Sequence, residues 1–262
     1  MTQAREVLIP TSPEEAVAAF GDGSEVTVIG GGTIVVPAIT HGRLKPARAM
    51  LLGRAGLSGV TEAGSTITVG AGTPLGELVA LPAPLGPCAA NVADREIRAQ
   101  ATLGGNLCAG PGPDTPRGDL QGALLALDAV ARSAGSGGER TEALADFLGS
   151  SGDRLLLDVS FERPAAGAFA AIDYPHTHEY TVLAVSGARA ADGSVRLAVT
   201  GIAGHGVRLP SAEAAAGDPQ AAGEAALADA RLGDDALASA WYRAKTLPVL
   251  VRRVLAELQE AA

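Results

Sequence analysis

The stretch that decides the fold is Val26-Thr27-Val28-Ile29-Gly30-Gly31-Gly32-Thr33. Its first four residues are all β-branched and predict a strand, and the three glycines that follow predict a tight loop. Upstream, Glu6–Pro10 predicts a short strand. A helix is predicted from Pro13 to Phe20, because a hydroxyl residue precedes it, proline suits its first turn and acids follow near the positive end of its dipole. Strand, helix, strand and glycine loop together indicate the opening of an α/β unit.

A second glycine-centred loop is predicted at Thr102-Leu103-Gly104-Gly105-Asn106. In both stretches, small residues let consecutive backbone N–H groups converge on one point, which favours an anion such as a pyrophosphate. Either stretch alone is equally compatible with a tight turn in a glycine-rich chain. A Rossmann fingerprint is excluded because Val35 stands where it needs Gly or Ala, and a P-loop is excluded because no Lys-Ser/Thr follows either stretch.

Hydrophobic periodicity and turn residues predict the other elements. A change in composition after Arg163-Pro164 predicts a domain boundary near residue 164. The Ser/Gly-rich segment Ala131–Glu142 is expected to be a turn between strands or a surface loop. Asp192-Gly193 predicts a hairpin turn. The predicted strands are Ala49–Leu52, Thr66–Val69, Tyr180–Ala188 and Val195–Ile202, and helices are predicted to start at Thr73 and to cover Asp119–Ala129, Ser211–Leu232 and Asp235–Glu260, the last kinked at Pro248.

Composition narrows the class of protein. The chain has 262 residues, 47% of them hydrophobic, which is enough to bury a core, and its net charge of −9 argues against nucleic acid or an anionic membrane as the main partner. No apolar run reaches the length of a membrane span, and no secretory signal is evident, so a reduced, cytoplasmic setting is expected. Cys88 and Cys108 are expected to be buried packing residues, since two cysteines cannot hold an iron–sulfur cluster. The four histidines are too scattered to predict a metal site.

The two glycine stretches and their surroundings resemble the FAD-binding (medium) subunit of the molybdenum hydroxylases, the family of carbon monoxide dehydrogenase and xanthine dehydrogenase. That family has an Ala-Gly-Gly-Thr/His loop after its second strand, and an Ile-Arg pair that leads into Thr-x-Gly-Gly-Asn. An Asp precedes its Leu-Leu-Ala-Leu-Asp-Ala segment, and its C-terminal helix contains Ser-x-x-Tyr-Arg and Val-Arg-Arg. The matching stretches here are Gly30–Thr33, Ile97–Asn106, Asp119 with Leu124–Ala129, Ser239–Arg243 and Val251–Arg253.

The resemblance implies an α+β fold. Two α/β FAD-binding subdomains of the PCMH type, about 1–58 and 59–163, would form an FAD-binding domain over 1–163. They would clasp an extended FAD between them. A C-terminal domain over 164–262 would consist of an antiparallel sheet with helices behind it.

The resemblance also implies where FAD binds. Backbone amides of residues 31–35 would hold the pyrophosphate, the second stretch would close over the cofactor, and Asp119 would accept a hydrogen bond from a cofactor hydroxyl. Helix N-capping is the alternative role for Asp119, and its choice over Asp114 rests on the spacing to Leu124. The implied cofactor-binding residues are Gly30, Gly31, Gly32, Thr33, Ile34, Val35, Val92, Thr102, Gly104, Gly105, Asn106, Asp119 and Leu155.

The function implied is electron transfer. The chain would take electrons from an iron–sulfur small subunit, which receives them from a molybdenum-cofactor large subunit, and would pass them through FAD to an external acceptor. Non-covalent FAD is expected, because Thr33 stands where covalent relatives carry His. No catalytic residue or metal ligand is assigned to this chain.

Two alternatives remain open at this stage. One is a stand-alone FAD oxidoreductase, and the other is a flavin-free assembly or binding module. They arise because the family's Lys near the flavin ring is absent from residues 165–180, where Asp173, His176 and His178 stand instead.

Overall fold

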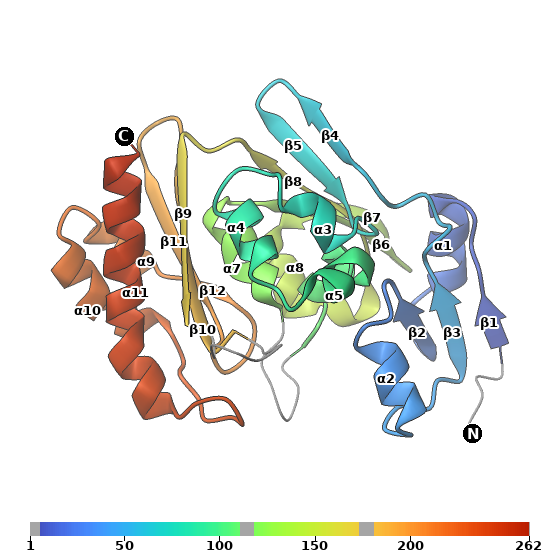
Figure 1. Cartoon of the computed structure of the whole chain (residues 1–262). Coiled ribbons are helices and arrows are strands. Elements are labelled where there is room, and N and C mark those ends of the chain that lie inside the picture. Colours follow the sequence, from blue (N-terminus) through green and yellow to red (C-terminus); the bar gives the residue numbers. More distant parts are fainter. Residues whose placement is uncertain (1–5, 111–117, 173–180, 262) are drawn as a thin grey trace. The chain divides into compact units, whose positions relative to one another are not determined.

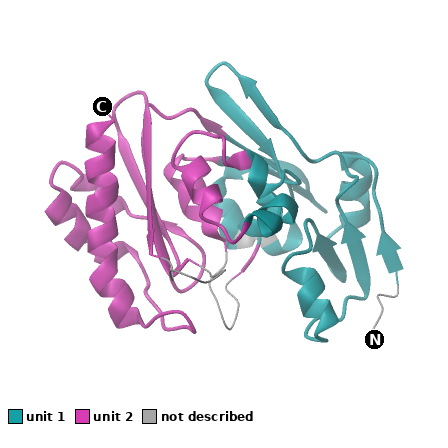
Figure 2. Ribbon diagram, viewed as in Figure 1, with its two compact units in different colours: residues 1–77, 95–108, 130–160 teal, residues 78–94, 109–129, 161–262 magenta. Residues whose placement is uncertain are grey.

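The computed structural model describes residues 6–110, 118–172 and 181–261 (Figure 1). The chain forms two compact units (Figure 2). Unit 1 comprises residues 1–77, 95–108 and 130–160, and unit 2 comprises residues 78–94, 109–129 and 161–262. This division differs from the predicted domains, because 78–94 and 109–129 belong with the C-terminal part of the chain.

Unit 1 begins with a parallel sheet of three strands in the order β1-β3-β2. Helix α1 starts as predicted: the hydroxyl of Ser12 accepts a hydrogen bond from the Glu15 amide at 3.2 Å. Its buried residues Ala16 and Phe20 pack with Met50 in the core of this unit. The elements are β1 (Glu6–Leu8), α1 (Pro13–Phe20), β2 (Val26–Ile29), α2 (Val35–Thr40) and β3 (Arg48–Leu51).

The second sheet of unit 1 has five strands in the order β4-β5-β8-β6-β7. The expectation of a turn or loop over Ala131–Glu142 is wrong, because β6 and β7 form a hairpin there and β6 buries Ala131 and Ser133. Part of the Ser/Gly cluster lies in the strands themselves, since Ser133 and Gly135 belong to β6 and Gly138 to β7. The elements are β4 (Val60–Ala63), β5 (Thr66–Gly70), α3 (Leu75–Leu78), α5 (Arg95–Gln100), α6 (Leu103–Leu107), β6 (Val130–Gly135), β7 (Gly138–Ala143), α8 (Leu144–Ser150), the 3-10 turn η1 (Ser151–Asp153) and β8 (Leu155–Glu162).

Unit 2 is built on an antiparallel sheet in the order β12-β11-β10-β9 (Figure 1). Val199 on β11 belongs to the core shared with α11, whereas the adjacent Thr200 faces Gly122 of α7. Since neighbouring strand residues point to opposite faces, α7 and α11 cover the two faces of this sheet. The elements are α4 (Leu85–Ala90), α7 (Asp119–Ala126), β9 (Ala166–Ile172), β10 (Leu183–Arg189), β11 (Val195–Thr200), β12 (Val207–Arg208), α9 (Pro210–Ala214), α10 (Pro219–Asp229) and α11 (Ala240–Glu260).

The C-terminal helices differ from the prediction at their ends. Helix α11 starts at Ala240 rather than Asp235, with Ser239 as its cap. Asp235 lies before the helix and accepts two hydrogen bonds from the buried guanidinium of Arg243, at 2.7 and 2.8 Å. The segment predicted as one helix over 211–232 is two helices, because Asp218 caps α10 at Pro219.

The predicted fold class is confirmed: the chain is α+β, with an α/β portion that contains the glycine loop and a C-terminal antiparallel sheet backed by helices. In the described ranges, no helix is both long and apolar enough to cross a membrane.

Candidate cofactor site

The loop between β2 and α2 offers a row of unused backbone donors. Gly32 has a left-handed φ of +75°, which a glycine adopts without strain, and its carbonyl accepts from the Val36 amide at 2.9 Å. Across the described residues, the amides of 31–35 have no acceptor within the chain. The side chain of Ile34 is 43% exposed. Five consecutive donors are therefore available to an anionic ligand.

The second glycine stretch is the start of a helix and not the loop that was predicted. Thr102 caps α6, and its Oγ1 accepts from the Gly105 amide at 3.1 Å. The amides of Leu103 and Gly104 donate to Thr73 and Ala71 at 2.9 and 2.8 Å, and the Asn106 amide donates to the Thr102 carbonyl at 2.9 Å. Every amide from 103 to 106 is thus used inside the chain, so this stretch does not repeat the free donors of the first.

The two stretches meet inside unit 1. A Cβ added to Gly30 would lie 2.5 Å from Thr102 Oγ1, and a Cβ added to Gly31 would overlap the carbonyl oxygen of Gln100. Glycine is required at position 31 because the backbone of 100–101 passes this close, whereas a side chain at position 30 would displace the Thr102 hydroxyl. The structure therefore brings Gly30 and Gly31 against residues 100–102, and it gives these two glycines a packing role that the sequence did not reveal.

The other predicted site residues lie in different surroundings. Leu155 is buried in the core of unit 1 with Ala134 and Leu157. Val92 is buried and follows α4, and Asp119 is the first residue of α7; both belong to unit 2. Asp114, Asp173, His176 and His178 fall outside the described residues.

The alternative of Asp119 as a helix N-cap is wrong. Gly118 occupies the cap position with a φ of +81°, a backbone conformation that suits glycine. Asp119 stands one residue later, in the first turn, where its negative charge interacts favourably with the positive end of the helix dipole. Its side chain is therefore not required as the cap.

The two cysteines differ in exposure. Cys88 is buried as expected, and its Sγ donates to the Asp119 carbonyl at 3.3 Å. Burial raises the pKa of the Cys88 thiol well above its ordinary value, and the charge of Asp119 adds to the rise. Cys88 is thus an unreactive thiol that packs α4 against α7. The expectation that Cys108 is buried is wrong, since it is exposed at the end of α6.

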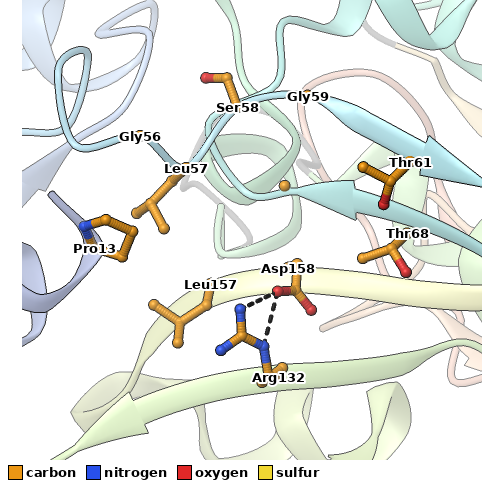
Figure 3. Close-up of a pocket in the computed structure, with 11 residues that line it drawn as sticks. Pro13, Gly56, Leu57, Ser58, Gly59, Thr61, Thr68, Arg132, Leu157 and Asp158 are labelled. Atoms are coloured by element: carbon orange, nitrogen blue, oxygen red, sulfur yellow. Dashed lines mark hydrogen bonds and ion pairs between the residues drawn. The ribbon is translucent and has the colours of Figure 1, made fainter.

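A separate pocket of about 200 Å³ lies in unit 1 (Figure 3). Arg132 donates through Nε to Asp158 Oδ2 at 2.8 Å and through Nη1 to Glu139 at 3.2 Å, so carboxylates already neutralise the only cation that lines it. No residue predicted to bind the cofactor lines this pocket. The other lining residues are Pro13, Gly56, Leu57, Ser58, Gly59, Thr61, Thr68, Gly70 and Leu157.

No set of three or more His, Cys, Asp or Glu side chains in the described parts of the chain is arranged to hold a metal ion.

Comparison with known proteins identifies the family and the fold. The model of the "FAD binding domain in molybdopterin dehydrogenase" matches residues 3–161. The chain belongs to this family. It is therefore an FAD-binding member of an oxidoreductase family, and the resemblance based on the two glycine stretches is confirmed.

One curated relative is similar along most of the chain, and another over less than half of it. The nicotine 6-hydroxylase medium subunit of Paenarthrobacter nicotinovorans is 28% identical, over 95% of both chains. The carbon monoxide dehydrogenase medium chain of Hydrogenophaga pseudoflava is 33% identical, over 41% of this chain and 40% of the relative.

Solved structures show the same fold. Carbon monoxide dehydrogenase from Hydrogenophaga pseudoflava has a TM-score of 0.87 at 24% identity, covering 100% of this chain and 99% of that one. Quinoline 2-oxidoreductase from Pseudomonas putida 86 has a TM-score of 0.83 at 20% identity, with the same coverage.

The loop of this FAD-binding family member fits the cofactor that its family binds. The amides of 31–35 are donors without acceptors in the described structure, and a pyrophosphate carries only acceptors. Sequence reasoning found this loop but missed its neighbours: Gln100 lies against Gly31, and Ala71 and Thr73 accept from the amides of Gly104 and Leu103 in the second stretch. These residues act through backbone carbonyls, which any residue possesses, so the sequence carries no signal for them.

Proposed function

We propose that this chain is the FAD-binding electron-transfer subunit of a molybdenum hydroxylase complex. It would take electrons from iron–sulfur clusters on a small subunit and pass them to an external acceptor, while a large subunit with the molybdenum cofactor oxidises the substrate. The observation that supports this most directly is the run of five amides without acceptors in a loop of the family's FAD-binding domain. The medium-subunit relatives support the partners.

The chain's own residues bind and orient the cofactor. The amides of 31–35 hold the pyrophosphate, and the hydroxyl of Thr33 adds a donor. The Thr102 and Asn106 side chains, with Gly104 and Gly105, lie over the cofactor. Bound FAD supplies the redox chemistry, so the protein needs no general base.

In unit 2, Asp119 accepts a hydrogen bond from a cofactor hydroxyl, which a carboxylate does better than a neutral acceptor. Val92 and Leu155, whose side chains are buried, contribute apolar packing behind the cofactor site. Binding is non-covalent, because Thr33 offers no imidazole for a covalent link to the flavin.

The first experiment is an absorption spectrum of the purified chain, followed by acid release of any chromophore. We expect a flavin spectrum and free FAD in the supernatant. Flavin that stays in the acid pellet would contradict non-covalent binding. A colourless chain that also fails to take up added FAD would overturn the proposal in favour of a flavin-free binding module.

Competition then tests the role of the loop. ADP carries the pyrophosphate but no flavin, whereas riboflavin carries the flavin ring but no phosphate. We expect ADP to compete with FAD for the apoprotein and riboflavin to compete far less. The reverse order would show that the loop amides do not hold the pyrophosphate.

Partners are tested by purification from the native source with iron and molybdenum analysis. We expect both metals to co-purify with this chain in stoichiometric amounts, and the flavin of the complex to be reduced on substrate addition. A chain that carries FAD, lacks partners and oxidises a substrate unaided would instead be a stand-alone oxidoreductase.

A further inference from the structure

Gln121 is a fully buried polar side chain in the first turn of α7. Its Oε1 accepts from the Gly206 amide at 2.7 Å, and its Nε2 lies 3.2 Å from Nδ1 of His205. The Gly206 N–H requires the oxygen on that side, so the NH₂ group faces His205 and donates to the ring nitrogen. A buried carboxamide without such partners would be costly, and these contacts give it a fixed position.

Close packing reinforces this position. A Cβ on Gly118 would overlap the Gln121 carboxamide, and a Cβ on Gly206 would lie 3.1 Å from Gln121 Cβ and 2.9 Å from Thr200 Cγ2. A Cβ on Gly122 would approach Thr200 Cγ2 to 3.1 Å. Glycines on both sides therefore let the start of α7 lie directly against β11 and the segment before β12.

Asp119 stands two residues before Gln121 on the same helical turn. Successive residues of an α-helix are about 100° apart, so these two side chains leave the helix about 200° apart. Gln121 thus fixes the helix from the side away from Asp119. The Cys88 thiol holds the Asp119 carbonyl from α4, at 3.3 Å.

We propose that Gln121 is a positioning residue for the cofactor site: through His205 and Gly206 it holds the first turn of α7, so that Asp119 meets the cofactor hydroxyl. This inference rests on the proposed function, in which Asp119 is a cofactor ligand. A side chain that binds a ligand by a hydrogen bond must be held in the right geometry by the packing and hydrogen bonds of the residues around it.

The test replaces Gln121 by Met, which has a similar length and neither hydrogen bond. We expect the Kd of the apoprotein for FAD, measured by flavin fluorescence quenching, to rise about tenfold. The matched control is Gln220→Met on the exposed face of α10. That side chain also makes two hydrogen bonds, to Glu224 and Arg252 at 2.6 Å each, and its loss is expected to leave the Kd for FAD unchanged.

A double-mutant cycle separates positioning from general destabilisation. If Gln121 acts through Asp119, Gln121→Met adds less than a twofold loss of affinity once Asp119→Asn is present. A full tenfold further loss in the double variant would overturn the inference, since Gln121 would then act independently of Asp119. If Gln121→Met fails to fold, His205→Ala removes the contact to His205 and enters the same cycle. We expect this variant alone to raise the Kd about threefold and to add nothing once Asp119→Asn is present.

The two proposals fail differently. A wild-type chain that takes up no FAD would overturn both. A wild-type chain that binds FAD while Gln121→Met binds it equally well would overturn only the positioning role.

Discussion

The two glycine stretches look alike in the sequence and differ in the structure. Both combine a threonine with consecutive glycines. In the first, the amides of 31–35 have no acceptor among the described residues, whereas in the second, every amide of 103–106 has an acceptor inside the chain. The first leaves its backbone donors available to a ligand, and the second is a capped helix start.

The difference comes from the neighbours of each stretch. Thr102 pairs with Pro74 in an isolated β-bridge, and the carbonyls of Ala71 and Thr73 lie where the amides of α6 need acceptors. The first stretch instead follows β2, an edge strand of its sheet. Small residues allow both outcomes, and the acceptors nearby decide between them.

The largest effect is expected from Gly31→Ala. Its Cβ would overlap the backbone oxygen of Gln100, which cannot rotate away, so we expect the free energy of unfolding to fall by about 3 kcal/mol or more and FAD to be lost. Urea denaturation and flavin content measure both effects. Gly53→Ala is the control, because a Cβ there meets nothing within 4 Å. Equal stability of the two variants would show that the stretches do not meet.

Gly104→Ala is expected to cost less. Its Cβ would lie 3.0 Å from the Ala71 carbonyl oxygen, which belongs to the backbone, so we expect a loss of about 1–2 kcal/mol in urea denaturation. Gly105→Ala serves as the comparison, since it is exposed and its Cβ approaches only the Thr102 hydroxyl. We expect Gly105→Ala to be nearly neutral. A larger loss for Gly105 than for Gly104 would contradict the packing described for α6.

The sequence predicted correctly those elements whose signals lie in a few adjacent residues. The strand Val26–Ile29, the Ser12 cap of α1 and the turn at Gly193 between β10 and β11 were predicted correctly, because each depends on a few adjacent residues. The hairpin of β6 and β7 was missed because its Ser and Gly residues indicate a loop when burial is unknown. Ser133 is accommodated there by a hydrogen bond from the buried Arg154, at 2.8 Å.

For the candidate site, too, only the features that depend on adjacent residues could be predicted. Residues 30–35 were identified from composition and resemblance, yet nothing local shows which amides have acceptors. The amides of 103 and 104 find their acceptors at Thr73 and Ala71, about thirty residues earlier in the sequence, and no such carbonyl accepts from the amides of 31–35 in the described structure. The sequence also could not show that Gly118, and not Asp119, is the N-cap of α7. That depends on the left-handed backbone at residue 118.

Thr102→Ala tests the helix cap itself. The variant loses the acceptor for the Gly105 amide, and we expect the free energy of unfolding to fall by about 1 kcal/mol. Thr102→Ser keeps the hydroxyl and is expected to restore most of that loss. If Thr102→Ser were as unstable as Thr102→Ala in thermal unfolding, packing of the methyl group and not capping would explain the threonine.

The smallest effect is expected from Thr33→Val, which separates ligand binding from stability. Within the described residues, the Thr33 hydroxyl has no hydrogen-bond partner, so its replacement by an equally branched methyl group is expected to leave the melting temperature of the apoprotein unchanged. The Kd for FAD is expected to rise about 3–10-fold, because one donor to the pyrophosphate is lost. Thr33→Ser keeps that donor and is expected to bind like the wild type. A stability loss without an affinity loss would mean that Thr33 supports the fold, and the first stretch would then resemble the second.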